Sequence, residues 1–229
     1  MKGTLFVVAT PIGNLQDITI RAEKVLENVD VIACEDTRKT GLLLQRLGIS
    51  KKARLVSYYE ENELRRIPEI VGFLKSGKNV ALVSNAGTPT ISDPGFKLIR
   101  ECISQGINIV SVPGPSAVLA ALVVSGFPSD KFLFLGYLPK KINKRKKLLE
   151  SVEKLPFSCT LIIFESPKRV IKLLKEIKDI FGNIEVVIAK ELTKLFEKTL
   201  RGKTEALIRL LEKEPPRGEM TLLINLPLR

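Results

Sequence analysis

Residues Asn79–Gly95 read NVALVSNAGTPTISDPG, and this stretch decides the fold. Its apolar, β-branched start at Val80–Val83 predicts a buried strand, and the small and turn-forming residues that follow predict a loop. Pro94 predicts that a helix begins there, with Ser92 or Asp93 as its N-cap. A strand that ends in a small-residue loop before a helix is where α/β sheets bind ligands. The loop therefore predicts a ligand site, although an ordinary connecting loop of this composition is the alternative.

The same alternation of strand and helix fills the first half of the chain. Apolar runs bounded by turn residues predict strands at Thr4–Thr10, Asp30–Cys34, Arg54–Tyr58, Val80–Ser84 and Asn108–Val112. Helical spacing of apolar residues predicts helices at Thr19–Val29, Thr40–Leu47, Glu63–Leu74 and Pro94–Ser104. This order predicts a parallel sheet that is covered by helices on both faces.

The second half differs. The chain is broken at Pro113-Gly114-Pro115 and again at Gly126-Phe127-Pro128; we place the domain junction between these breaks and assign the domains as 1–114 and 115–229. Strands are expected at Phe132–Tyr137, Thr160–Phe164, Glu185–Ala189, Lys198–Arg201 and Met220–Leu226. Helices are expected at Ser116–Ser125, Arg145–Glu153, Arg169–Ile180 and Lys203–Lys213. The gap between the third and fourth of these strands is too short for a crossover helix, which predicts a mixed sheet. The fold class is thus α/β, with a parallel sheet and flanking helices in the first domain and a mixed sheet with helices in the second.

Charge is distributed unevenly along the 229 residues, whose net charge is +12. Residues 1–125 carry 15 basic against 12 acidic residues, and residues 126–229 carry 22 against 13. The densest basic cluster consists of Lys140, Lys141, Lys144, Arg145, Lys146 and Lys147. Such a cluster attracts a polyanion, and we expect it to bind RNA; the alternative is a solvated helix face.

The absence of histidine and the few cysteines restrict the chemistry. Cys34, Cys102 and Cys159 are isolated in sequence and fit reduced core thiols better than disulfides or a metal site. Without histidine there is no Ser-His-Asp triad and no Cys-His pair, so we expect no metal and a reaction that needs little acid–base help, such as transfer from an activated donor. The apolar runs are too short to span a membrane and the chain enters a strand at once, so we expect a cytoplasmic protein.

Four loops of the first half are expected to meet at one edge of the sheet, because each follows a parallel strand. They are Pro11–Leu15, Glu35–Lys39, Asn85–Gly95 and Pro113–Ala117. None of them matches the glycine patterns that bind dinucleotides or the phosphate groups of nucleoside triphosphates. In the second half, Phe164–Arg169 and Lys190–Lys194 also stand at strand ends.

Eight segments together resemble one family, the tetrapyrrole-methylase-like S-adenosylmethionine methyltransferases. Within it they are similar to the branch that methylates a ribose 2′-hydroxyl of small-subunit (16S) ribosomal RNA. The segments, in chain order, are VATPIGNLQDIT (Val8–Thr19), CEDTRKTGLLL (Cys34–Leu44), ALVSNAGTPTISDPG (Ala81–Gly95), VPGPSA (Val112–Ala117), FLFLGYLPK (Phe132–Lys140), FESPKR (Phe164–Arg169), KELTK (Lys190–Lys194) and GEMTLLI (Gly218–Ile224).

The resemblance implies two α/β domains with S-adenosyl-L-methionine in the cleft between them, a homodimer, and small-subunit ribosomal RNA or the 30S subunit as the partner. Carried over by position, the cofactor-lining residues are Pro11, Gly87, Thr88, Pro89, Ile91, Ser116, Ala117, Phe164, Ala189 and Met220. The reaction is methyl transfer to a cytidine 2′-oxygen. We expect Glu35 or Asp36 to accept the proton, and Arg38, Lys39 or Lys194 to stabilise developing negative charge.

The chain departs from the family pattern where the ribosomal-RNA branch commonly has histidine. Lys39, Tyr59, Glu61 and Lys168 stand at those positions, and Asn85 stands where the branch often has aspartate. Two alternatives remain open. One is a carbon methyltransferase acting on a porphyrin-like or precorrin-like ring, and the other is a non-catalytic RNA-binding or ribosome-assembly protein with the same fold.

Overall fold

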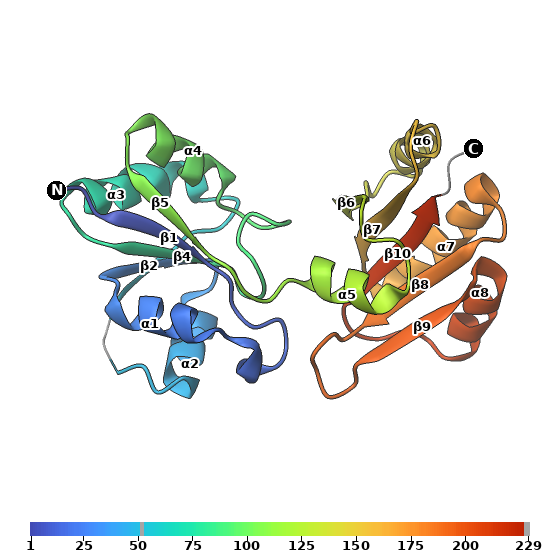
Figure 1. Ribbon diagram of the computed structural model, residues 1–229, viewed down its shortest axis with the longest axis horizontal. Coiled ribbons are helices and arrows are strands. Elements are labelled where there is room, and N and C mark those ends of the chain that lie inside the picture. Colours follow the sequence, from blue (N-terminus) through green and yellow to red (C-terminus); the bar gives the residue numbers. More distant parts are fainter. Residues whose placement is uncertain (51–52, 227–229) are drawn as a thin grey trace. The chain divides into compact units, whose positions relative to one another are not determined.

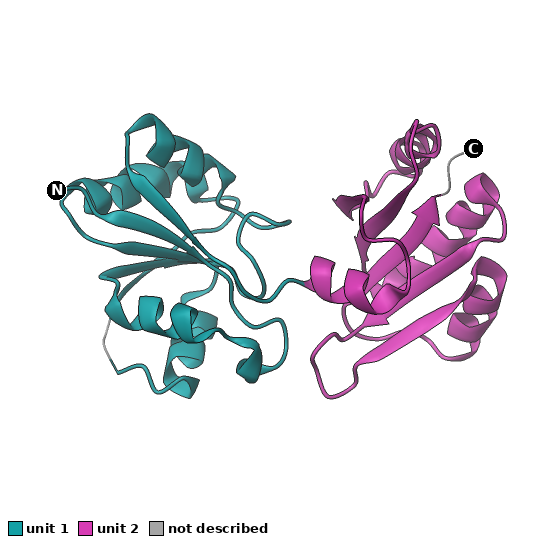
Figure 2. Cartoon of the chain, viewed as in Figure 1, with its two compact units in different colours: residues 1–116 teal, residues 117–229 magenta. Residues whose placement is uncertain are grey.

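The computed structural model describes residues 1–50 and 53–226, and the chain forms two compact units, Met1–Ser116 and Ala117–Arg229 (Figure 2). The division at residues 114/115 stays a prediction about which parts of the chain fold independently. Each unit contains one sheet.

The first unit is built on a parallel sheet whose central strand is the stretch that predicted the fold. Its strands are β1 (Thr4–Val8), β2 (Val31–Cys34), β3 (Arg54–Ser57), β4 (Val80–Val83) and β5 (Asn108–Val112). They lie in the order β3-β2-β4-β1-β5, and each pair is parallel. All four residues of β4 are buried, as a strand covered on both faces requires. The predicted parallel sheet is confirmed.

Helices cover both faces of this sheet (Figure 1). They are α1 (Ile20–Asn28), α2 (Thr37–Arg46), α3 (Glu63–Lys75) and α4 (Phe96–Ser104). Alternate residues of each strand point to opposite faces. Leu82 therefore packs in one core with α3 and α4, and Ala81 packs in the other with α1 and α2. A short 3₁₀ helix, Leu15–Asp17, follows β1.

Two helices of this unit begin elsewhere than predicted. Helix α2 begins at Thr37 instead of Thr40, because the Asp36 carboxylate accepts a hydrogen bond from the Arg38 backbone N–H at 2.9 Å and caps the helix earlier. Helix α4 begins at Phe96, so the prediction of a start at Pro94 with Ser92 or Asp93 as N-cap is wrong. The N-cap is Gly95, whose φ of +138° no other residue adopts easily. A Cβ there would lie 2.8 Å from Leu82 Cδ2, which leaves glycine as the residue that fits this turn.

The second unit has the predicted mixed sheet. Its strands are β6 (Phe132–Tyr137), β7 (Cys159–Glu165), β8 (Glu185–Lys190), β9 (Lys198–Lys203) and β10 (Met220–Leu226), in the order β6-β7-β10-β8-β9. Strands β6 and β7 are parallel, and the remaining neighbours are antiparallel. Its helices are α5 (Ala117–Ser125), α6 (Ile142–Glu153), α7 (Pro167–Phe181) and α8 (Thr204–Lys213). Helices α6 and α7 begin before their predicted starts at Arg145 and Arg169, and Pro167 at the first turn of α7 suits that position.

The two faces of this second sheet are covered by different helices. Leu161, Ile188 and Leu222 belong to the core that contains residues of α6, α7 and α8. Helix α5 packs against β8, β9 and β10 on the other face. Since side chains alternate along a strand, the neighbours of the core residues point to the α5 face.

The three cysteines lie buried and unpaired in the described part of the chain. Within residues 1–50 and 53–226, no helix combines the length and the apolar character needed to cross a membrane.

Candidate functional site

Loops at the carboxyl edge of the first sheet are tied to one another. Thr10 and Gly87 exchange two backbone hydrogen bonds of 2.9 Å, which join the loop after β1 to the loop after β4. Thr10 Oγ1 also donates to the Ser84 carbonyl at 3.1 Å, and Thr88 Oγ1 donates to the Pro115 carbonyl at 3.1 Å. Neighbouring strands β1 and β4 lead to helices on opposite faces of the sheet, which is the arrangement that opens a ligand crevice in α/β sheets.

Glycine lets these loops approach closely. A Cβ on Gly87 would lie 3.3 Å from Ile12 Cγ2, and one on Gly114 would lie 3.1 Å from the Ala9 Cβ. The predicted cofactor residues of this unit stand on the same loops: Gly87 and Pro89 are buried, Pro11, Thr88 and Ser116 are half-buried, and Ile91 is exposed. Buried Gly87 and Pro89 thus shape the platform, and the side chains of Pro11, Thr88 and Ile91 are accessible at its surface.

Glu35 and Asn85 form a pair across the ends of β2 and β4. Asn85 donates from its backbone N–H to Glu35 Oε1 at 2.8 Å and from its side-chain amide to Oε2 at 3.2 Å. An aspartate at position 85 would place a second carboxylate where the amide now donates. The neutral residue therefore fixes the orientation of Glu35, which explains why an amide is compatible with this site.

The side chains of Asp36 and Arg38 form an ion pair. Arg38 Nε and Nη2 lie 3.1 and 2.7 Å from the two carboxylate oxygens of Asp36, which also caps α2. Hydrogen bonds from the Arg38 side chain and backbone hold the pKa of Asp36 well below its usual value. Asp36 is therefore a weak proton acceptor, and Lys39 next to the pair is exposed.

Asp93 was not among the predicted catalytic residues, yet its environment suits proton uptake better than that of Asp36. Burial raises its pKa to about 6, with the negative charge of Glu35 adding to the shift and a hydrogen bond from Ser84 opposing it. Asp93 lines a pocket of about 260 Å³ together with Glu60, Glu63 and Lys97. The sequence showed Asp93 as a charged residue in the ligand loop, but burial and the proximity of Glu35 depend on the folded chain.

In the second unit, strand register brings Phe164 and Ala189 onto one face, with Thr221 between them. Thr221 of β10 is paired with Phe164 of β7 on one side and with Ala189 of β8 on the other. The three side chains therefore point the same way. Thr221 was missed in the sequence because only the pairing of the strands reveals it.

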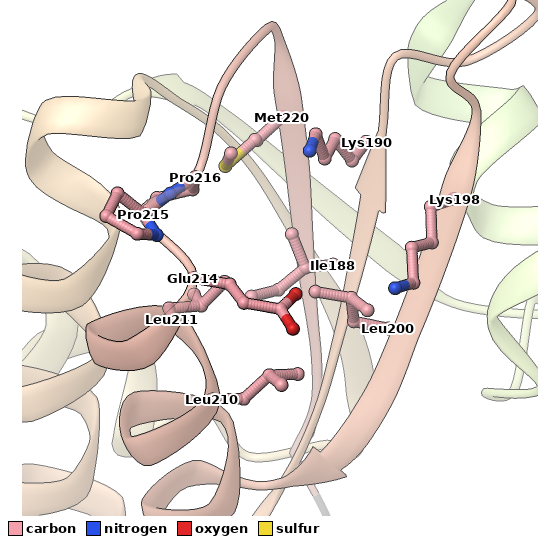
Figure 3. Close-up of a pocket in the computed structure, with 10 residues that line it drawn as sticks. All are labelled: Ile188, Lys190, Lys198, Leu200, Leu210, Leu211, Glu214, Pro215, Pro216 and Met220. Atoms are coloured by element: carbon pink, nitrogen blue, oxygen red, sulfur yellow. The ribbon is translucent and has the colours of Figure 1, made fainter.

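Met220 does not join this group. It is paired with Glu165 and Lys190, the neighbours of Phe164 and Ala189, and it lies in the core on the side of α8. Its side chain lines a pocket of about 120 Å³ with Leu211 and Pro216 (Figure 3). Thr221, one residue along the strand, is thus the β10 residue that shares a face with Phe164 and Ala189, and the assignment of Met220 to the cofactor stays a prediction.

Lys194 holds the β8–β9 loop to the start of β10. Its Nζ lies 3.1 Å from Glu191 Oε1 and 2.9 Å from Glu219 Oε2, and Glu191 Oε1 also accepts the Glu219 backbone N–H at 2.8 Å. Burial opposes the charge of Lys194, but the hydrogen bonds with Glu219 and Glu191 outweigh it and raise the lysine pKa. Lys194 is thus a paired cation with a structural role.

The basic cluster divides into exposed lysines and one buried arginine. The Arg145 side chain is 4% exposed, and its Nε and Nη2 lie 2.5 and 2.6 Å from the two Glu176 carboxylate oxygens. Arg145 Nη1 also donates to the carbonyls of Pro139 and Lys140. Lys140, Lys141, Lys144 and Lys147 are exposed, and Lys146 is half-buried. Arg145 therefore stabilises the unit, and the exposed lysines remain as the polyanion-binding candidates.

Comparison with known proteins supports the family resemblance. The pattern of the tetrapyrrole (corrin/porphyrin) methylases matches residues 4–208. A ribosomal RNA small subunit methyltransferase I from Thermotoga maritima is 49% identical, with 97% of this chain and 98% of the relative covered. The protein of that name from Escherichia coli O157:H7 is 46% identical, with 98% and 78% covered. Two solved structures share the fold at low identity. The uroporphyrin III C-methyl transferase from Thermus thermophilus has a TM-score of 0.66 at 16% identity (96% of this chain and 97% of that chain covered), and the cobalt precorrin-4 methyltransferase CbiF has 0.68 at 20% (96% and 94% covered).

Proposed function

Because the chain belongs to the tetrapyrrole methylase family, we propose that it methylates the ribose 2′-hydroxyl of a cytidine in small-subunit (16S) ribosomal RNA, with S-adenosyl-L-methionine as methyl donor. The observation that carries the proposal is the 49% identity, over nearly the full length of both chains, to a ribosomal RNA small subunit methyltransferase I. The two porphyrin-type methyltransferases share only the fold, so the ring-methylating alternative has weaker support.

The residues at the two sheet edges fit this cofactor. The tied loops of the first unit present Pro11, Thr88 and Ile91 beside close-packed glycine backbone. In the second unit, Phe164 is half-buried at the end of β7, and Ala189 and Thr221, which share its face, are buried beneath it. Small and apolar groups of this kind suit an adenosine and methionine moiety, and S-adenosylmethionine supplies a methyl group on a sulfonium that is already a good leaving group. The protein's main task is then to position the acceptor.

The ribose hydroxyl must lose its proton during or after methyl transfer, and a carboxylate is the side chain suited to accept it. Glu35 is oriented by Asn85, and Asp93 has a pKa of about 6, close to the range in which a general base works at neutral pH. Asp36 is occupied by Arg38, and Lys194 is paired with two glutamates. We therefore assign proton uptake to Glu35 or Asp93, and keep exposed Lys39 as the cation that stabilises developing negative charge.

The RNA phosphates are held by the four exposed lysines of the basic cluster, Lys140, Lys141, Lys144 and Lys147. The substrate is the ribosomal RNA itself or the 30S subunit, and the site of action is the cytoplasm, where ribosomes assemble. A homodimer is proposed from the family resemblance, and light scattering measures it.

The deciding experiment incubates the protein with labelled S-adenosylmethionine and immature small subunits, followed by alkaline hydrolysis of the RNA. A 2′-O-methyl group blocks cleavage at its own phosphodiester, so we expect label in an alkali-resistant dinucleotide that contains cytidine. Subunits from cells that carry the modification serve as the control and should accept no label. Label in a base would contradict ribose methylation. Cofactor binding without RNA labelling would favour a ring substrate, and no cofactor binding would favour the non-catalytic alternative.

A further inference from the structure

A β-bulge reverses the direction of one aromatic side chain at the edge of the second sheet. In the parallel pairing of β6 and β7, Phe134 is opposite Ile162, but Gly136 is opposite Ile163. Leu135 is therefore an extra residue, and Gly136 has the positive φ of 62° that such bulges use. Without the bulge, Tyr137 would be opposite Glu165 on the face that α6, α7 and α8 cover. With it, Tyr137 is opposite Phe164, on the face that also carries Ala189 and Thr221.

Tyr137 and Phe164 are in contact on this face. Their ring centroids are 5.7 Å apart at an interplanar angle of 60°, and Phe134 contacts Phe164 edge-on at 4.8 Å. Tyr137 remains 59% exposed at the end of the edge strand. An aromatic ring that contacts a neighbouring ring and is still more than half exposed offers a surface for stacking.

The chain that follows Tyr137 is held by two arginines. Arg169 Nη2 donates to the Leu138 carbonyl at 2.9 Å, and Arg145 Nη1 donates to the next two carbonyls, those of Pro139 and Lys140, at 2.9 and 3.2 Å. Both guanidinium groups are paired with buried glutamates, Glu165 and Glu176. These hydrogen bonds hold the backbone between Tyr137 and the exposed lysines Lys140 and Lys141, which follow it three and four residues along the chain.

We propose that Tyr137 is the stacking surface for an unpaired base of the RNA substrate. The proposal rests on the proposed function, because Phe164, which the Tyr137 ring contacts, is one of the residues assigned to the cofactor. Proteins recognise single-stranded RNA by combining lysines that hold the backbone with aromatic rings on which bases stack. Tyr137 and the adjoining lysines provide both, at the end of the sheet where the methyl donor is expected.

The test compares Tyr137→Leu, which removes the ring, with Tyr137→Phe, which keeps it. We expect Tyr137→Leu to raise the KM for RNA and the Kd for unmodified RNA by about tenfold or more, the loss of one base stack. Tyr137→Phe should stay close to the wild type in both. Phe157→Leu is the matched control, since Phe157 is an exposed ring of the same unit just before the opposite end of β7. It should leave both constants unchanged.

Calorimetry with S-adenosylmethionine alone shows whether the Tyr137 ring contacts the cofactor or a base of the RNA. We expect Tyr137→Leu to bind the cofactor as the wild type does; an equal loss of cofactor affinity would assign the ring to the cofactor and overturn the proposal. Unchanged RNA affinity in Tyr137→Leu would also overturn it. If the wild type itself places no label on a ribose, the proposed function fails, and the Kd values for RNA still decide the role of Tyr137.

Discussion

At the residue scale, the half-buried carboxylate of Asp93 should make stability depend on pH. The pKa of Asp93 is raised from 3.8 to about 6, so the folded state favours the protonated form. Relative to a charged Asp93, the protonated form stabilises the folded state. This stabilisation is fully present below about pH 4 and is lost as the pH rises through 6. Asp93→Asn removes the cost of the charge, and we expect it to raise the free energy of unfolding at pH 7.5 by about 1–2 kcal/mol, the two-unit shift reduced for partial exposure.

Urea unfolding at pH 4, 5.5 and 7.5 measures this effect. The gain of Asp93→Asn over the wild type should vanish at pH 4, where both side chains are neutral. An equal gain at all three pH values would show that packing, and not charge, changed. A gain in stability accompanied by slower methylation is expected if Asp93 takes up the proton, because functional groups are often held in costly environments.

Arg145 shows how a residue can match a surface pattern and still belong to the core. Its pairing with Glu176 is almost fully buried, so removal of one partner leaves an uncompensated charge. We expect Arg145→Met to lower the free energy of unfolding by about 3–5 kcal/mol, and Arg145→Met with Glu176→Leu to recover much of this loss. Lys144→Met, an exposed neighbour, should change it by less than about 0.5 kcal/mol. A double variant no more stable than the single one would argue against the ion pair as the cause.

At the scale of elements, Asp36 has a structural role that can be separated from a catalytic one. Its carboxylate caps α2, and asparagine caps helices equally well. We expect Asp36→Ala to lower the melting temperature by about 2–4 °C. Asp36→Asn should keep both the melting temperature and the methylation rate. A stable Asp36→Asn protein without activity would instead identify this carboxylate as the proton acceptor.

The elements themselves could be predicted well because the apolar pattern of β4 and its neighbours is local. Helix starts were harder, since they depend on caps and contacts between distant residues. Gly95 begins α4 because Leu82 and Thr90 leave no room for a side chain, and the sequence shows only a favourable Pro94. The sequence also could not predict which face of the sheet each β10 side chain points to. Met220 and Thr221 are adjacent, and only the pairing of β10 with β7 and β8 shows that Thr221 lies on the face of Phe164.

The same reasoning explains why the candidate site was predicted as a region more than as a set of residues. Loops that follow parallel strands necessarily meet at one edge, so Pro11, Glu35 and Gly87 could be grouped from the order of elements alone. Which charges are already paired depends on three-dimensional neighbours. Asp36 is paired with Arg38, which is near in sequence, but the second partner of Lys194 is Glu219, 25 residues along the chain, which only the folded strands bring close.

At the scale of the whole molecule, the uneven distribution of basic residues gives the two units different expected roles in RNA binding. Residues 126–229 carry 22 basic against 13 acidic residues, and the exposed lysines Lys140, Lys141, Lys144 and Lys147 follow directly on the proposed stacking residue Tyr137. The first unit carries the hydrogen-bonded loops and the carboxylates of Glu35 and Asp93. We assign no RNA phosphate contact to it. Binding of RNA should therefore depend on where positive charge is removed, and not only on how much.

Two variants with equal change in net charge test this dependence. One replaces the four exposed lysines of the basic cluster with glutamine, and the other replaces four exposed lysines of the first unit, Lys2, Lys24, Lys75 and Lys78. Each phosphate contact contributes about 0.7–0.9 to the slope of log affinity against log salt concentration, so the first variant should reduce that slope by about 3. The second should leave it nearly unchanged, because three of its lysines precede β1 and β4 at the edge opposite the ligand loops. Equal slopes for the two variants, measured by filter binding from 50 to 300 mM salt, would mean that net charge alone attracts the RNA and that the basic cluster is only a solvated helix face.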